Sequence, residues 1–290
     1  MTPAVLALVL VSAVIHATWN LWTKQIGETA RRGTLMWVLV TLSALFYAVP
    51  AVMMSRAIGW QPDREALLFI VGSGVIHVLY FLCLLTGYRR SDLSVVYPLA
   101  RGSGPMLAGL AALVLFSEPA TPWTIGGIAA IGVGVLTLSG LFSAKSSDES
   151  LSAGVRWGLA TGAFIALYTL WDGWAVKEVG IPPVLFYWAG ELVRVVLFTP
   201  AAIADRAGVR RLVQTHPWRV LGIAALSPLS YMLILTAMQW GAVSHIAPAR
   251  EVGILIGAWL GGQVLGERAR RRRLAAAALF VVGILLLAKG

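Results

Sequence analysis

Long apolar runs, separated by short polar segments, extend from one end of the chain to the other. A helix needs about 20 apolar residues to cross the hydrocarbon core of a bilayer. The runs also lack the alternation of apolar and polar residues that marks a lipid-facing barrel strand. The pattern therefore predicts ten transmembrane helices, at residues 2–23, 34–55, 66–87, 93–116, 123–142, 155–176, 183–204, 218–240, 244–265 and 274–288.

The second half of the chain repeats the first. The motif Trp19-Asn20-Leu21-Trp22 returns as Trp171-Asp172-Gly173-Trp174. Each copy holds five predicted helices, and because five is odd, the second copy enters the membrane from the opposite side. Many secondary transporters use inverted repeats of this kind to build one site that both faces can reach. Further matched positions are Tyr80 with Tyr231, Pro98 with Pro248, Arg101 with Arg250, Glu118 with Glu267 and Gly134 with Gly283.

The expected fold is an all-α polytopic membrane protein in which two inverted five-helix repeats surround a central cavity. Residues 1–143 form the first repeat, residues 154–290 form the second, and the polar stretch 144–153 links them. The first 24 residues lack a basic segment and run without a break into the tryptophan motif. We therefore expect a spanning helix there and not a cleaved signal peptide.

Composition favours the same class and argues against others. The chain is 58% hydrophobic and 12% charged, with a mean hydropathy of +0.80, which is outside the range of a soluble domain. The single cysteine, Cys83, lies in an apolar run and offers neither a disulfide nor a cysteine metal site. The motifs HExxH, GxSxG and GxxxxGK[ST] do not occur. We therefore expect no enzyme activity, no cofactor and no metal.

The net charge of +10 indicates a membrane topology and not a nucleic-acid partner. If the predicted helices alternate sides, the loops on one face carry sixteen lysines and arginines and the other face carries four. Basic loops stay on the cytoplasmic side, so the bias places both termini outside the cytoplasm. Arg270 to Arg273 are also placed to touch anionic lipid headgroups. The sixteen are Lys24, Arg31, Arg32, Arg89, Arg90, Lys145, Arg156, Arg206, Arg210, Arg211, Arg219, Arg268 and Arg270 to Arg273.

Three segments resemble EamA-type proteins of the drug/metabolite transporter superfamily, within a likeness that covers essentially the whole chain. They are His16-Ala17-Thr18-Trp19-Asn20, the run from Ser94 to Gly102, and Glu118. The resemblance implies a ten-helix bundle with pseudo-two-fold symmetry around a cavity. It also implies transport of small metabolites, often amino-acid export, in the bacterial inner membrane. Members are often described with cytoplasmic termini, whereas the charges here favour the reverse.

Polar residues inside the predicted helices are candidates for the site, because each is costly in hydrocarbon without a partner or a cavity. His16 and Asn20 share one face of the first helix, and Tyr168 and Asp172 hold the matching positions of the sixth. The two stripes form either cavity walls or hydrogen-bonded clamps between helices. Lys24 lies at a helix end, where we expect it to snorkel.

Arg101 and Arg250 are matched arginines that follow prolines. They either bind a substrate carboxylate or are neutralised inside the bundle by Glu251, Glu191 or Asp172; Glu191 and Arg194 are spaced as an internal pair. His77 either lines the cavity or bonds a helix carbonyl. The candidate substrate-binding residues are His16, Trp19, Asn20, His77, Tyr80, Tyr97, Arg101, Tyr168, Trp171, Asp172, Tyr231 and Arg250.

The resulting hypothesis is a secondary transporter that exports small metabolites, specifically amino acids, by alternating access. A lipid-linked-sugar flippase and a small-drug efflux carrier are the alternatives. The expected partners are a small-molecule substrate and membrane lipid. Rows of small residues serve internal packing or a homodimer; we expect a functional monomer and leave the homodimer open. The rows are Gly104, Ala108 and Ala112, and Gly253, Gly257 and Gly261.

Overall fold

The computed structural model describes residues 1–26, 31–91, 93–139, 148–256 and 270–290. Regular structure in these ranges is entirely α-helical and comprises eleven helices. The fold is therefore all-α, as predicted. The helices are α1 (Pro3–Ile26), α2 (Arg32–Ile58), α3 (Arg64–Arg90), α4 (Leu93–Leu115), α5 (Pro122–Ser139), α6 (Asp148–Lys177), α7 (Pro183–Ala204), α8 (Arg206–Thr215), α9 (Pro217–Trp240), α10 (Val243–Ala249) and α12 (Arg270–Lys289).

Several of these helices are suited to cross a membrane, which makes the chain a multi-pass membrane protein. By length and apolar composition, six qualify within the part of the chain that the structure describes: α1, α2, α3, α4, α7 and α9. Shorter apolar segments lie at Pro122–Thr137 and Leu274–Lys289. The last nine residues of the predicted ninth span, 257–265, lie outside the described residues, and with them Gly257, Gly261 and the following Glu267. The number of ten spans therefore stays a prediction.

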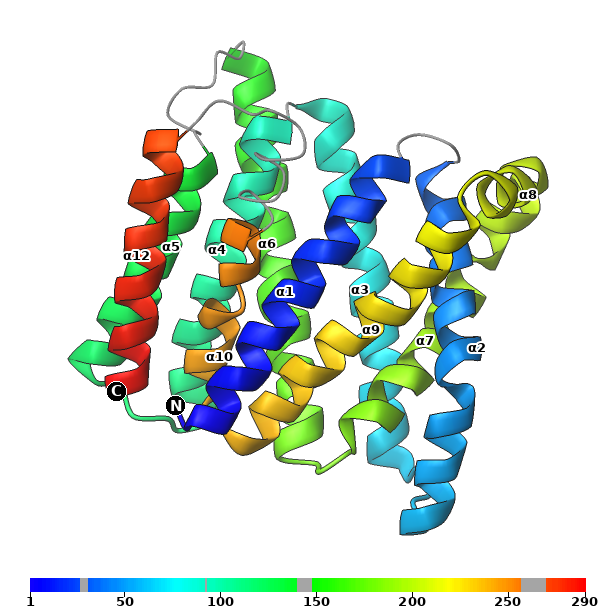
Figure 1. Ribbon diagram of the computed structural model, residues 1–290, viewed down its shortest axis with the longest axis horizontal. Helices are drawn as coiled ribbons and strands as arrows, with labels where there is room; N and C mark the ends of the chain where they lie inside the picture. Colours follow the sequence, from blue (N-terminus) through cyan, green and yellow to red (C-terminus); the bar gives the residue numbers. More distant parts are fainter. Residues whose placement is uncertain (27–30, 92, 140–147, 257–269) are drawn as a thin grey trace.

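Helices of the first half pack mainly against helices of the second half. α1 packs against α9 and α6 packs against α3; α2 pairs with α7, α5 with α12, and α4 with α6. Figure 1 shows the two chain termini at the same end of the bundle. We call this the terminal end, and the opposite end, which carries Arg31, Arg32, Arg89, Arg90, Arg206, Arg210, Arg211 and Arg219, the arginine end.

Glycine notches allow the helices of the two halves to approach closely. A Cβ atom at Gly72 on α3 would collide with the indole of Trp171 on α6. On α9, a Cβ at Gly222 would likewise collide with the ring of Trp22 on α1. On α4, a Cβ at Gly104 would lie 2.6 Å from Ile165 of α6. In lipid, where no hydrophobic effect drives helices together, close contact at small residues stabilises their packing. The row that begins at Gly104 therefore packs α4 against α6 inside the bundle.

The short helix α8 is an element that the span prediction did not contain. It buries Gly208 and Leu212. The Asp205 carboxylate caps it by accepting a hydrogen bond from the Gly208 backbone N–H at 3.1 Å. The Thr34 hydroxyl of α2 donates to the same carboxylate at 2.9 Å, and this bond lowers the pKa of Asp205. The carboxylate therefore ties α8 to α2.

Candidate functional site

A cavity of about 260 Å³ lies between the two halves of the bundle. Side chains from α1, α2, α3, α4, α6, α7 and α9, together with two residues that follow α10, line it. On α2 the lining runs from Met36 to Ser43, in the half of that helix nearer the arginine end. The cavity therefore extends from mid-depth toward the arginine end. Its wall is mostly apolar with a few polar groups, as in most small-molecule sites.

Two arginines share one carboxylate at one side of the cavity. Arg101 Nε lies 3.5 Å from Glu251 Oε2, and Arg250 Nε lies 3.3 Å from Glu251 Oε1. The Glu251 side chain is almost fully buried. Arg101 also contacts His16 Nε2 at 3.0 Å, and Arg250 donates to the Tyr168 hydroxyl at 3.3 Å. Two positive groups facing one negative group leave this cluster with an excess of one positive charge.

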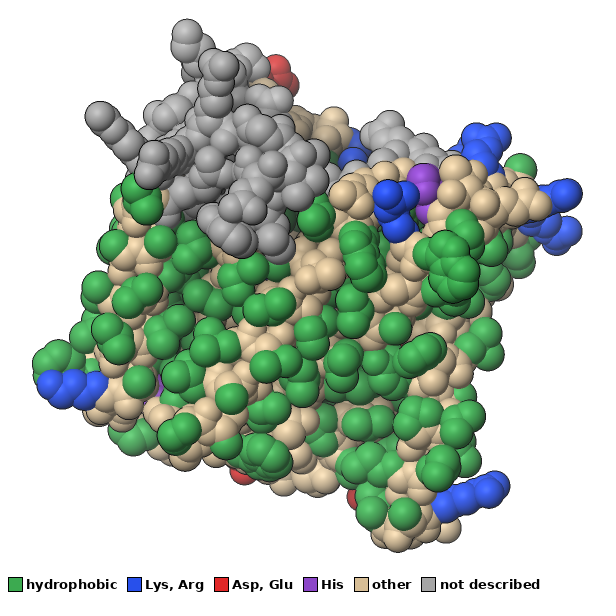
Figure 2. Space-filling view, viewed as in Figure 1, with side chains coloured by type: hydrophobic (Ala, Val, Ile, Leu, Met, Phe, Trp, Pro, Cys, Tyr) green, Lys and Arg blue, Asp and Glu red, His purple; other side chains and the backbone are tan. Residues whose placement is uncertain are grey.

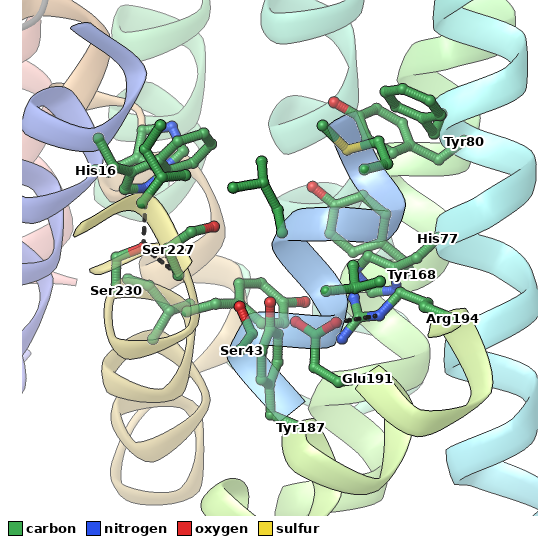
Figure 3. A pocket seen from close by; sticks show the side chains of 18 of the residues that line it. His16, Ser43, His77, Tyr80, Tyr168, Tyr187, Glu191, Arg194, Ser227 and Ser230 are labelled. Atoms are coloured by element: carbon green, nitrogen blue, oxygen red, sulfur yellow. Dashed lines mark hydrogen bonds and ion pairs between the residues drawn. The ribbon is translucent and has the colours of Figure 1, made fainter. Parts of the chain in front are cut away.

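A second charged pair projects from α7 into the cavity (Figure 3). Glu191 Oε2 and Arg194 Nε, three residues apart along the helix, lie 3.4 Å from each other. The Arg194 guanidinium also lies 4.7 Å from the centre of the Tyr187 ring. Neither Glu191 Oε2 nor Arg194 Nε has a hydrogen-bond partner among the described residues. The contact between these two atoms is therefore an ion pair without the directional hydrogen bonds that stabilise the strongest buried pairs.

A connected aromatic wall joins the two charged clusters. His77 stacks on Tyr168 with ring centres 4.4 Å apart, and Tyr231 meets the His77 ring edge at 5.9 Å. Tyr80 lies 5.5 Å from Tyr168, and Tyr187 lies 5.6 Å from Tyr231. The rings come from α3, α6, α7 and α9. His77 Nδ1 also lies 2.9 Å from the Ser73 carbonyl oxygen, so this histidine both lines the cavity and bonds its own helix.

The structure brings eight of the twelve candidate residues to the cavity wall and places four elsewhere. Asn20 donates its amide to the His16 carbonyl at 2.7 Å. Trp171 donates to the Phe69 carbonyl at 2.9 Å, and Asp172 is fully buried behind Tyr231. Tyr97 is 38% exposed and does not line the cavity. The eight are His16, Trp19, His77, Tyr80, Arg101, Tyr168, Tyr231 and Arg250. The side chains of Lys24 and Pro98 lie outside the described set.

Other lining residues are absent from the candidate set. The serine hydroxyls at Ser43, Ser227 and Ser230 contribute polar groups, and Ser230 accepts from the Trp19 indole at 3.4 Å. Isolated serines in apolar runs carry no positional signal, so sequence reasoning had no means to find them. The α7 group was detectable, because Tyr187, Glu191 and Arg194 follow helical spacing and ionisable residues in a membrane helix indicate function.

Comparisons with known proteins agree with this architecture. Residues 3–140 match the model of the EamA-like transporter family. A solved structure titled only "Crystal structure of protein" superposes with a TM-score of 0.78 and 14% sequence identity, covering 99% of each chain. At that identity the likeness shows the fold alone. The search of curated proteins found no match.

Proposed function

Because residues 3–140 match the model of the EamA-like transporter family, we propose that this chain is a secondary transporter that exports amino acids across the bacterial inner membrane by alternating access. The observation that carries the substrate class is the pair Arg101 and Arg250, which share the single carboxylate of Glu251. A substrate carboxylate would supply the second negative group that this cluster lacks. Guanidinium groups suit this role because their planar fork matches a carboxylate.

The other features of the cavity suit the remainder of an amino acid. Glu191 on α7 offers a carboxylate for the substrate ammonium group. The rings of His77, Tyr168 and Tyr231 offer flat surfaces that accept side chains of different shape. An aromatic wall with two charged clusters therefore favours a zwitterion with a variable side chain.

The packing of the two halves supports inverted repeats and ten spans. α1 on α9 and α6 on α3 are equivalent pairs when the halves are exchanged, and in each pair a glycine of one helix receives a tryptophan ring of the other. In this arrangement the substrate binds between the halves. Rocking of one group of helices against its repeat mate then exposes the site to each side in turn.

Cavity size favours a small metabolite over the alternatives. At about 260 Å³, the cavity falls below the range of about 300–1,000 Å³ that is usual for drug-sized ligands. A lipid-linked sugar would need a larger headgroup chamber, and a small-drug carrier would need more apolar room. We therefore place the flippase and the drug carrier second.

The test is exchange of labelled amino acids by the purified protein in liposomes. Arg101→Gln and Arg250→Gln should each raise KM by about 10- to 100-fold, because a hydrogen bond to a charged group is worth about 1.5–3 kcal/mol. Arg101→Lys retains the charge without the fork and should give a smaller effect. Arg89→Gln, an exposed arginine at the end of α3, is the control and should transport normally.

Two results would count against the proposal at different levels. Unchanged KM in both arginine variants would exclude a carboxylate clamp at this cluster. Absence of flux for all common amino acids, from folded wild-type protein, would exclude amino-acid export while leaving the transporter class intact.

A further inference from the structure

Helix α8 is an added element at the arginine end. It joins α7 to α9, whereas the corresponding connection in the first half, between α2 and α3, is the short segment 59–63. Figure 1 shows α8 nearly end-on while the spanning helices run across the picture. Its axis therefore lies across the spans, along the plane expected for the membrane surface. A helix of this kind with one buried and one basic face is typical of the membrane interface.

The exposed arginines of α8 have no ion-pair or hydrogen-bond partner among the described residues. They are Arg206, Arg210 and Arg211. The nearby carboxylate, Asp205, is already engaged by Thr34 and by the helix N-terminus. This corner therefore carries several exposed guanidinium groups that an anion can reach.

An apolar crevice of about 220 Å³ lies beside these arginines. Trp37 of α2, Ala202 and Ile203 of α7, and Val209 of α8 form its apolar wall, and Arg206 also lines it. Thr199 contributes a hydroxyl that is already used, since it accepts from the Trp37 indole at 3.1 Å and donates to the Val195 carbonyl. The crevice thus combines an apolar surface with one exposed cationic group, Arg206.

Exposed apolar side chains surround the same corner. Trp218, at the start of α9, is 83% exposed and Ile203 is 58% exposed. Figure 2 shows blue basic and green apolar side chains side by side at this edge of the molecule. Tryptophan and arginine together are the pattern of residues that sit at headgroup depth. A water-soluble anion would match the arginines but not the apolar surface.

We propose that this corner binds one anionic phospholipid, with its phosphate on Arg206 and Arg210 and an acyl chain in the crevice between Trp37, Ile203 and Val209. The lipid would contact α2 and α7, which belong to different halves. Both helices also line the central cavity, through Met36 beside Trp37 and through Phe198 beside Thr199. A lipid in the crevice therefore bridges the two halves next to the cavity. The proposal does not depend on which substrate the protein carries.

The experiment titrates the purified full chain in a neutral detergent with phosphatidylglycerol or phosphatidylcholine of identical acyl chains. Lipid adducts are measured by native mass spectrometry, and thermal unfolding is followed in parallel. Phosphatidylglycerol should bind more tightly than phosphatidylcholine and raise the melting temperature. Arg206→Gln with Arg210→Gln should weaken phosphatidylglycerol on the order of tenfold and remove the preference between the lipids. Arg56→Gln, an exposed arginine at the terminal end, is the matched control and should behave as wild type.

A second variant tests the acyl chain separately. Ile203→Gln alters an exposed residue, so it should fold normally, and it should weaken both lipids while keeping the preference for phosphatidylglycerol. Equal binding of the two lipids by wild type would overturn the proposal, and so would an arginine variant that binds like wild type. If inorganic phosphate alone reproduces the thermal shift, the arginines bind a free anion and not a lipid, and the proposal is wrong. If Ile203→Gln binds both lipids as tightly as wild type does, the acyl chain does not lie in the crevice, and that part of the proposal is wrong.

Discussion

Tyr231 bonds a carboxyl group that has no contact with solvent. Its hydroxyl donates to Asp172 Oδ2 at 2.7 Å, and His77 Nε2 lies 3.8 Å from the same oxygen. The other oxygen, Asp172 Oδ1, has no hydrogen-bond partner among the described residues. Loss of the hydrogen bond from Tyr231 should therefore destabilise the protein, because a buried polar group without a partner leaves its desolvation uncompensated.

Tyr231→Phe should destabilise the protein by about 1–3 kcal/mol, measured by unfolding in mixed micelles. The change removes the donor and leaves the carboxyl group buried. Tyr47→Phe is the matched control, since the Tyr47 hydroxyl donates at 2.6 Å to the Ala225 carbonyl on α9, the helix that carries Tyr231. That carbonyl is neutral, so the control should lose less. Equal losses for the two variants would show that the carboxyl group is not what makes the Tyr231 bond costly to remove.

At the residue scale, sequence spacing identified which helix faces are polar but not how each side chain is used. Matched stripes on the first and sixth spans led to His16 and Tyr168, which do line the cavity. Asn20 and Trp171 belong to the same motifs, yet both donate to backbone carbonyls. The choice between a helix carbonyl and a cavity depends on rotamers and on neighbouring helices, which residue spacing does not contain.

The start of α10 is held by a residue of the other half. Glu118, just beyond α4, accepts hydrogen bonds from the backbone N–H groups of Val243 at 2.7 Å and Ser244 at 2.8 Å. Lys177, at the end of α6, lies 3.3 Å from the same carboxylate and donates to the Gly241 carbonyl at 2.9 Å. This clamp joins α4, α6 and α10 at the terminal end.

Glu118→Gln should lower the free energy of unfolding by about 1–3 kcal/mol, because the amide has one acceptor oxygen where the carboxylate has two. Lys177→Met should have a smaller effect, since it leaves both backbone bonds to Glu118 in place. A double-mutant cycle of the two changes measures their coupling. Strict additivity would contradict an ion pair between Lys177 and Glu118, and a stable Glu118→Ala variant would contradict the clamp.

Among the helices, those with long apolar runs were predictable and the short amphipathic one was not. The predicted span at 183–204 coincides with α7, and the span at 218–240 lies within one residue of α9. α8 escaped because a search for about 20 apolar residues passes over ten residues that contain three arginines. Its helical period, with Gly208 and Leu212 on the buried face, is a signal that a search for amphipathic helices would have found.

At the scale of the whole molecule, the separation of charge predicts membrane orientation. The arginine end should face the cytoplasm and the terminal end should face away from it. Arg56 lies at the terminal end and Arg89 at the arginine end, and both are exposed. The single cysteine, Cys83, is buried, so the native chain should give little background in thiol labelling.

Arg56→Cys should therefore react with a membrane-impermeant maleimide in intact cells. Arg89→Cys should react only in inverted vesicles, where the cytoplasmic face is outside. Labelling is measured as the mass shift of the purified protein, with wild type as the control for Cys83. The opposite pattern would place the termini in the cytoplasm and overturn the orientation derived from charge.

The packing of each half against the other also has a consequence for how the protein is made. During synthesis the first five helices enter the membrane before the second half exists. At that stage Arg101 lacks the carboxylate of Glu251, and Glu118 lacks the backbone N–H groups at the start of α10, because both partners belong to the second half. Unpaired charge in lipid is costly. We therefore expect the inserted part of the chain to be least stable midway through translation. The carboxylate of Glu251 arrives almost last, and only then can both arginines be neutralised.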